Sequence, residues 1–184
     1  MCRCLYHWSA HQQAKIIMNV TITTICLTAY ALGFANAEEV CRQSDTVVQL
    51  SQQYEMPPEL IVSLVYHESR WNPHTRSRAG ACGLTQVIPR WTRNPKVSCK
   101  QLKDDPVLSL RTGVKMLNNL LRSRRYASGN IKVALCMYNA GPSRCRHNSV
   151  KWRGNSYARR VLKTSKKFRD KMLTFDPEAE DEVF

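Results

Sequence analysis

Acidic residues are scarce in this chain. Only 14 Asp and Glu stand against 28 Lys and Arg, so the formal net charge is +14 over 184 residues. An excess of this size favours a polyanionic partner, which could be nucleic acid, anionic lipid or an acidic polymer of a cell envelope. The charge by itself does not choose among these partners.

The chain also lacks a convincing strand pattern, an internal repeat and a low-complexity tract. Its length allows one ordinary domain with appendages, and 43% hydrophobic with 23% charged residues is a globular composition. We therefore predict a single, mainly α domain over residues 45–173. Residues 174–184, after this domain, form an acidic tail that is predicted to be disordered.

Local signals place the helices of this domain. Ser44 is expected to cap a helix over residues 44–55, and Pro58 suits the first turn of the next helix, which cannot pass Asn72 because Pro73 follows. Asp105-Pro106 and Asn130 mark two further helix starts. A short helical turn is expected at residues 84–88, and a strongly basic helix at residues 156–173.

Residues 1–37 have the features of an export segment. An apolar run without charge spans residues 16–34, basic residues precede it, and the triplet Ala35-Asn36-Ala37 offers a cleavage site. Removal would leave 26 basic and 14 acidic residues, a net charge of +12. Either Met1 or Met18 could be the start. A membrane anchor is the competing interpretation, but we expect removal and no permanent membrane span.

The cysteines show no zinc-like CxxC spacing in the part that would remain, so neither a metal site nor a cofactor is expected. An oxidising compartment would allow two bridges and one spare thiol. Cys82 with Cys99, and Cys136 with Cys145, would each close a short loop, although spacing does not decide the connectivity. The five cysteines that would remain are Cys41, Cys82, Cys99, Cys136 and Cys145.

One carboxylate stands out at residues 60–73, LIVSLVYHESRWNP. Glu68 follows Ile61, Leu64 and Val65 at helical spacing, so it ends an apolar face. Burial and the negative end of the helix dipole would both raise its pKa, as a general acid working near neutral pH requires. A Glu that turns into solvent, or that pairs with an arginine, is the more ordinary interpretation of this spacing alone.

Further groups suited to a binding cleft follow in order along the chain. Gly80 and Gly83 permit a close backbone approach, and Gln86 offers an amide that can read an N-acetyl group. Tyr138 and Asn139 end an apolar helix at Gly141-Pro142, where they can line a groove for sugar rings. Taken singly, each of these residues has a structural interpretation: surface polar residue, core aromatic or helix cap.

Taken together, the motifs E68-S69-R70-W71-N72-P73, G80-A81-C82-G83-L84-T85-Q86-V87-I88-P89, Y138-N139-A140-G141 and Y157-A158-R159-R160 resemble the soluble lytic transglycosylase (SLT) family. The resemblance covers residues 47–173 and implies a lysozyme-like fold and a peptidoglycan substrate. It implies that Glu68 is catalytic, and that Ser77, Gln86, Tyr138 and Tyr157 hold the substrate. Ser69 and Asn139 would support the cleft, with Asn139 also counted among the binding residues.

The catalytic stretch contains no second carboxylate, which fits the mechanism that the resemblance implies. Glu68 would protonate the bridging oxygen between N-acetylmuramic acid and N-acetylglucosamine, and would then act as the base that closes a 1,6-anhydro ring. Two departures from the family concern Ile88, where relatives often have Met, and Arg153, where they have an acid nearby. Trp71 is assigned to packing, whereas Trp91 and Trp152 are assigned to either core or sugar stacking.

Other functions remain open on the sequence. A lysozyme-type hydrolase would keep the fold and cleave the glycan with water. A glycan-binding or assembly protein would bind glycan or an assembly partner without cleaving it. A nucleic-acid module would explain the charge, but no motif supports it. We expect a periplasmic or secreted enzyme that acts on peptidoglycan strands. Small members of the family serve secretion, conjugation or phage machines, and this chain has the size of such a member.

Overall fold

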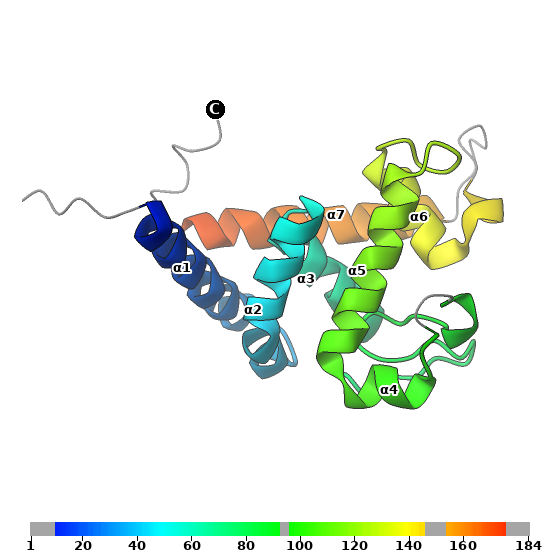
Figure 1. Cartoon of the computed structure of the whole chain (residues 1–184), viewed down its shortest axis with the longest axis horizontal. Coiled ribbons are helices and arrows are strands. Elements are labelled where there is room, and N and C mark those ends of the chain that lie inside the picture. Colours follow the sequence, from blue (N-terminus) through cyan, green and yellow to red (C-terminus); the bar gives the residue numbers. More distant parts are fainter. Residues whose placement is uncertain (1–9, 93–95, 146–153, 176–184) are drawn as a thin grey trace, which may run out of the picture.

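The computed structural model describes residues 10–92, 96–145 and 154–175. These residues form seven α-helices and no strand, so the predicted mainly α class is confirmed for the described part (Figure 1). Within it, no helix combines the length and the apolar character that crossing a membrane requires. The elements are α1 (Ala10–Ala31), α2 (Ala37–Tyr54), α3 (Pro58–Ser69), η1 (Pro89–Trp91), α4 (Cys99–Asp104), α5 (Pro106–Arg122), α6 (Ile131–Ala140), η2 (Pro142–Arg144) and α7 (Gly154–Leu173).

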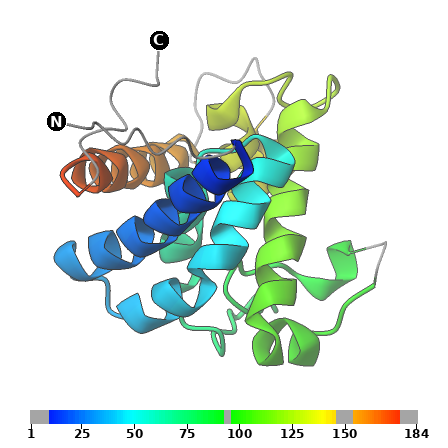
Figure 2. The same ribbon diagram turned by 60° about the vertical axis from the view of Figure 1, so that its left-hand side comes forward.

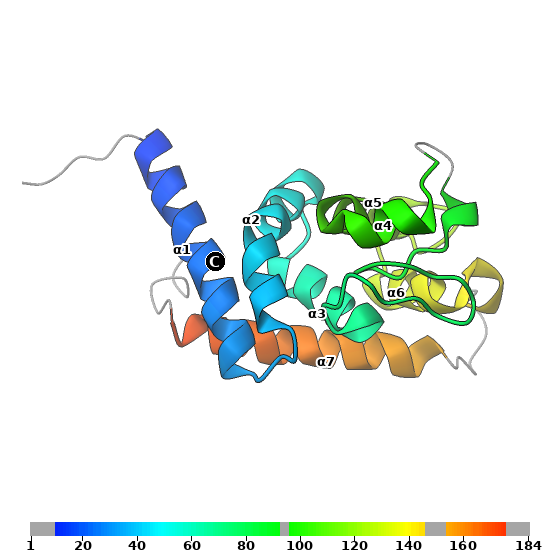
Figure 3. The same cartoon turned by 90° about the horizontal axis from the view of Figure 1, so that it is seen from below.

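Helix α3 lies at the centre of the molecule. It packs against α2 on one side and along α7 on the other, and Figure 3 shows α7 running the length of the domain beside it. Ile61, Leu64 and Val65 are fully buried, which confirms the apolar face predicted for this helix. Pro58 occupies its first turn, as predicted, because proline lacks only an N–H that a first turn leaves unpaired.

The N-terminal helices form a hairpin, and the predicted start of α2 is wrong. The helix begins at Ala37 rather than near Ser44, whose hydroxyl donates to the Val40 carbonyl inside the helix. A serine can make this bond at any interior position, so a possible cap is not by itself a boundary. Helix α1 packs on α2, and a disulfide joins Cys26 to Cys41. The predicted removal of residues 1–37 is not tested by these contacts.

The caps predicted for α5 and α6 are confirmed. The Asp105 carboxylate accepts from the Leu108 N–H at 2.9 Å, and the Asn130 side chain accepts from two N–H groups in the first turn of α6. Helix α7 begins at Gly154, two residues before the predicted Ser156. Of the predicted disordered tail, residues 176–184 lie outside the described part.

The long connection between α3 and α4 folds against α4 and α5. The helical turn predicted at residues 84–88 is wrong: residues 83–86 make a tight turn between Cys82 and Val87, which form an isolated bridge. A second, smaller core of Cys82, Val87, Val97 and Leu102 lies under this connection. The disulfide between Cys82 and Cys99 joins it to α4.

Candidate active site

Glu68 occupies the penultimate position of α3 and is half-buried. Burial raises the pKa of its carboxyl to about 7, and a hydrogen bond from Tyr157 opposes the rise. No ion pair with Glu68 occurs among the described residues. Within the described residues, Glu68 therefore neither turns fully into solvent nor pairs with an arginine, and its raised pKa is what a general acid near neutral pH requires.

Two consecutive residues in the left-handed region follow Ser69, the last residue of α3. Arg70 has a φ of 53° and Trp71 a φ of 63°, a conformation that costs roughly 1 kcal/mol per residue outside glycine. Trp71 is fully buried, and its indole N–H donates to the Val62 carbonyl at 3.2 Å. The predicted packing role of Trp71 is thus confirmed, and its burial stabilises the sharp bend beside Glu68.

Two tyrosines from different helices lie next to Glu68. The Tyr157 hydroxyl on α7 donates to Glu68 Oε1, and only 4% of this residue is exposed. Tyr138, near the end of α6, donates from its hydroxyl to the Thr85 carbonyl at 2.7 Å. Burial and the nearby Glu68 charge raise the pKa of both phenols well above the usual value, so both remain protonated donors at neutral pH.

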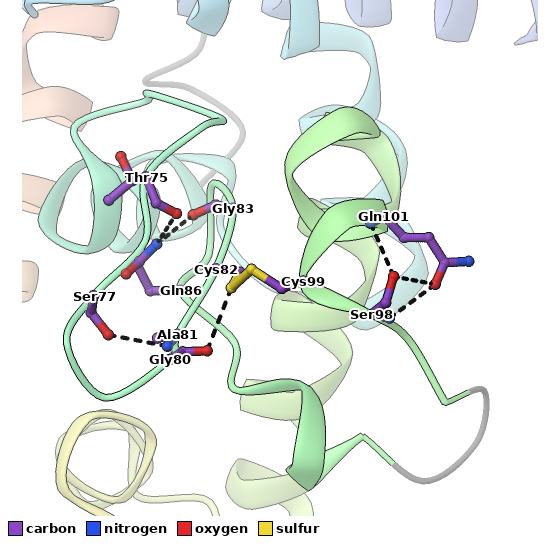
Figure 4. The surroundings of a disulfide bond; sticks show 10 residues. All are labelled: Thr75, Ser77, Gly80, Ala81, Cys82, Gly83, Gln86, Ser98, Cys99 and Gln101. Carbon is purple, nitrogen blue, oxygen red and sulfur yellow. Dashed lines mark hydrogen bonds between the residues drawn. A yellow bond between two sulfur atoms is a disulfide. The ribbon is translucent and has the colours of Figure 1, made fainter.

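Gln86 braces the loop with its own amide. Its Nε2 donates to the carbonyls of Thr75 and Gly83 at 3.0 and 2.9 Å, and its backbone φ is 49° (Figure 4). These bonds employ the amide nitrogen, which leaves the amide oxygen as the group that a ligand could use. The same view shows the disulfide between Cys82 and Cys99 joining this loop to α4.

The other predicted binding residues differ in their surroundings. Ser77 accepts a hydrogen bond from the Ala81 N–H at 3.1 Å, which closes the loop before Cys82 (Figure 4). Asn139 is exposed in the last turn of α6. Trp91 has 62% of its surface exposed, which rules out the core role, whereas Trp152 and Arg153 lie outside the described residues. The structure brings Tyr157 to Glu68, and the binding roles of all five residues stay predictions.

Sequence reasoning missed residues that hold these groups in place. Thr85 is fully buried and donates to the Ser109 carbonyl at 2.7 Å, so it ties the loop and Tyr138 to α5. His67 hydrogen bonds to the Thr164 hydroxyl at 2.8 Å and thereby links α3 to α7. Neither contact has a local sequence signal, because the partners lie 24 and 97 residues apart.

Replacing Tyr157 with Phe tests the contact with Glu68. The phenol lowers the pKa of Glu68, so its loss should raise that pKa and move the alkaline limb of the rate profile to higher pH. The rate itself should fall about tenfold to a hundredfold, because an aligning hydrogen bond to a charged group is lost. A pH–rate profile on peptidoglycan measures both effects, and an unchanged profile would contradict the assigned contact.

Comparisons with known sequences agree with this arrangement. The sequence model of the family described as "Transglycosylase SLT domain" matches residues 45–160. The transglycosylase of Enterobacteria phage PRD1 is 31% identical over 121 residues, covering 65% of this chain and 41% of that protein. The soluble lytic murein transglycosylase of Escherichia coli K12 is 30% identical over 113 residues, covering 57% of this chain and 16% of that protein. The chain thus spans less than half the length of either relative.

A solved structure shares the fold. An inactive mutant of the lytic transglycosylase Slt from Pseudomonas aeruginosa superposes with a TM-score of 0.60 at 21% identity, over 82% of this chain and 30% of that one. This likeness confirms the predicted lysozyme-like helical fold. With the family match spanning more than half of the residues, the chain belongs to the transglycosylase SLT domain family.

Proposed function

We propose that this protein is a peptidoglycan lytic transglycosylase that cleaves the β-1,4 bond between N-acetylmuramic acid and N-acetylglucosamine. The observation that carries the proposal is Glu68, a single protected carboxyl with a pKa of about 7 and a phenol hydrogen bond. Two of the named relatives are lytic transglycosylases, and the name of one of them specifies murein. Family membership and site geometry therefore support the same chemistry.

The geometry suits one residue that acts twice. Because Tyr157 donates to Oε1 of Glu68, the proton of the neutral acid resides on Oε2, where it can pass to the bridging oxygen of the glycan. The acetamido group of the muramic sugar would stabilise the cationic centre in place of a protein nucleophile. Glu68, now ionised, would accept the proton of the C6 hydroxyl as that oxygen bonds to C1, which closes the 1,6-anhydro ring without consuming water.

A pKa of about 7 fits both steps at neutral pH. The first step requires the protonated form of Glu68 and the second requires the carboxylate, and near this pKa neither form is costly to reach. Glycosidases that use a pair of carboxylates divide these roles between two residues. Among the described residues, no second charged group contributes to the pKa shift of Glu68.

The muropeptides released from peptidoglycan test this function directly. Purified protein should release fragments that end in 1,6-anhydro-N-acetylmuramic acid, identified by mass spectrometry as lighter than the hydrolysed fragment by the mass of one water. Fragments with reducing muramic ends would show a hydrolase instead. Binding to peptidoglycan without any cleavage would show a glycan-binding protein.

We further propose that the protein works outside the cytoplasm. Disulfides persist in oxidising compartments, and the described residues contain three, Cys26–Cys41, Cys82–Cys99 and Cys136–Cys145. Peptidoglycan also lies in such a compartment in the periplasm. Service to a secretion, conjugation or phage machine remains a prediction, and the phage origin of one relative is consistent with it.

A further inference from the structure

The turn between α1 and α2 lies against the end of the helix that carries Glu68. Helix α1 ends at Ala31, and Gly33, two residues later, has a φ of 68°. The N–H groups of Gly33 and Phe34 donate to the carbonyls of Tyr30 and Ala29. This is the Schellman arrangement, in which the residue after the glycine makes an apolar contact. Here that residue is Phe34, and it is directed towards the domain.

Phe34 contacts both helices that build the acid site. Its ring stacks on Tyr66 of α3 with centroids 4.2 Å apart, and it lies 5.7 Å from the ring of Phe168 on α7. Tyr66 is two residues from Glu68, and α7 also carries Tyr157. Aromatic contacts pack helices at close and specific distances, so Phe34 is in a position to influence the spacing of the two elements that bring the phenol to the carboxylate.

Asn36 secures the bend that follows Glu68. Its side-chain Nδ2 donates to the carbonyl of Arg70 at 2.8 Å, across 34 residues of sequence. Asn36 precedes α2, yet its side chain caps no N–H of that helix. The amide is committed to the strained left-handed residue Arg70, where a bond to the carbonyl stabilises a conformation that is unfavourable outside glycine.

The hairpin that carries these residues is fastened to the domain. Ile25 and Ala29 of α1 are fully buried in the main core, and the disulfide between Cys26 and Cys41 joins α1 to α2. Figure 2 shows α1 lying across α2 beside α7, and α1 contacts both of these helices. Ala37, which would end a removed leader, is 5% exposed and begins α2.

We propose that Phe34 and Asn36 are positioning residues for Glu68, and that residues 21–37 therefore stay in the working protein. This inference rests on the proposed function, because it assigns the two residues a part in the same acid–base step. It replaces the prediction that the chain is cut after Ala37, since the cut would remove both side chains. Neither residue touches the substrate; both act through α3 and α7.

The Asn36→Asp variant tests the hydrogen bond from Asn36 to the Arg70 carbonyl, with little change in side-chain shape. An aspartate keeps the size of the side chain but cannot donate to the Arg70 carbonyl. The value of kcat should fall about tenfold while KM stays within about twofold, because misplacement by fractions of an ångström affects the reacting atoms and not glycan binding. Asn119→Asp, at an exposed position of α5, is the matched control and should keep the wild-type kcat.

Two substitutions of Phe34, one that removes the ring and one that keeps it, test the ring contacts with Tyr66 and Phe168. Phe34→Ala should lower kcat about tenfold or more with little change of KM, and Phe34→Tyr should restore it, because the ring contacts with Tyr66 and Phe168 return. Rates are compared below the unfolding transition of each variant, so that lost stability is not read as lost rate. Phe175→Ala, at an exposed residue after α7, is the control. A normal kcat in both Asn36→Asp and Phe34→Ala would overturn the proposal.

The intact mass of active protein tests the retention of the segment. After expression of residues 1–184, the active species should contain residues 21–37, with Cys26 and Cys41 found in one disulfide-linked peptide. An active species that begins at Glu38 and has the full kcat would overturn the inference. This failure differs from failure of the proposed function, in which the wild-type protein itself releases no anhydro-muropeptides. If reducing ends appear instead, the kcat comparisons still apply, because hydrolysis also needs the acid.

Discussion

Glu68→Gln should lower kcat on peptidoglycan by at least about a thousandfold, since a general acid and base contributes roughly 10²–10⁴ and the proposed mechanism gives this residue both roles. The glutamine amide cannot give a proton to the bridging oxygen or take one from the C6 hydroxyl. Its carbonyl can still accept the hydrogen bond of Tyr157, so the fold and glycan binding should persist. Release of anhydro-muropeptides measures the rate, and cosedimentation with peptidoglycan measures the binding.

The same variant should change stability in a pH-dependent way. The folded pKa of Glu68, about 7, is raised above the ordinary value of 4.5, so its contribution to stability is complete below pH 4.5 and is lost as the pH rises through 7. Above that pH, ionisation of Glu68 lowers the free energy of unfolding of the wild type by about 3 kcal/mol, and a neutral glutamine avoids this loss. Urea unfolding at about pH 5 and about pH 8.5 measures the free energy of unfolding, and the value for the variant should rise relative to that of the wild type at the higher pH.

Glu59→Gln is the control for both measurements of activity and binding. It removes a carboxylate from the first turn of the same helix, at the end away from Tyr157, and should leave the rate unchanged. Full cleavage by Glu68→Gln would refute the assignment of the acid. A stability difference that is the same at both pH values would refute the buried, proton-sharing environment described for Glu68.

Local signals predicted much of the helical frame, because each depends on neighbours in the chain. Asp105 and Asn130 cap α5 and α6 as expected, and proline placed the start of α3. The predicted start of α2 was wrong because Ser44 bonds inside the helix. The turn at residues 83–86 was missed because the Gln86 side chain folds back onto the carbonyls of Thr75 and Gly83, which no periodicity encodes.

The site required contacts that sequence order does not reveal. Glu68 could be singled out from its place at the end of an apolar face, but its partner Tyr157 lies 89 residues away. The connectivity of the cysteines was left open by the sequence, and Cys26 had been placed in the export segment and so was not counted; the structure pairs it with Cys41. The contact of Phe34 had a local sign, a glycine and an aromatic residue after an apolar helix, which the interpretation as a cleavage region concealed.

Gly83→Ala should be the most destabilising single substitution in the loop that carries Gln86. The φ of Gly83 is 77°, which costs an alanine roughly 1–2 kcal/mol. A Cβ there would also lie 2.2 Å from the carbonyl oxygen of Leu102 and 2.6 Å from the Ser109 hydroxyl, so the end of α4 would have to move. We expect a loss of about 3 kcal/mol or more, a fall in Tm of roughly 6–12 °C in calorimetry.

Gly80→Ala separates the two causes of that loss. Gly80 has a φ of 81°, nearly the same as that of Gly83, but a Cβ there would meet nothing within 4 Å. The Gly80→Ala variant should therefore lose only the roughly 1–2 kcal/mol of the left-handed conformation, a fall in Tm of about 2–8 °C. Equal losses in the two variants would contradict the close approach of the loop to α4. Because the Gly83 carbonyl accepts a hydrogen bond from the Gln86 amide, the folded fraction of Gly83→Ala should also show a raised KM, whereas Gly80→Ala should not.

The close packing of this loop against α4 gives the Gln86 amide a fixed orientation. A binding role for Gln86 requires such an orientation.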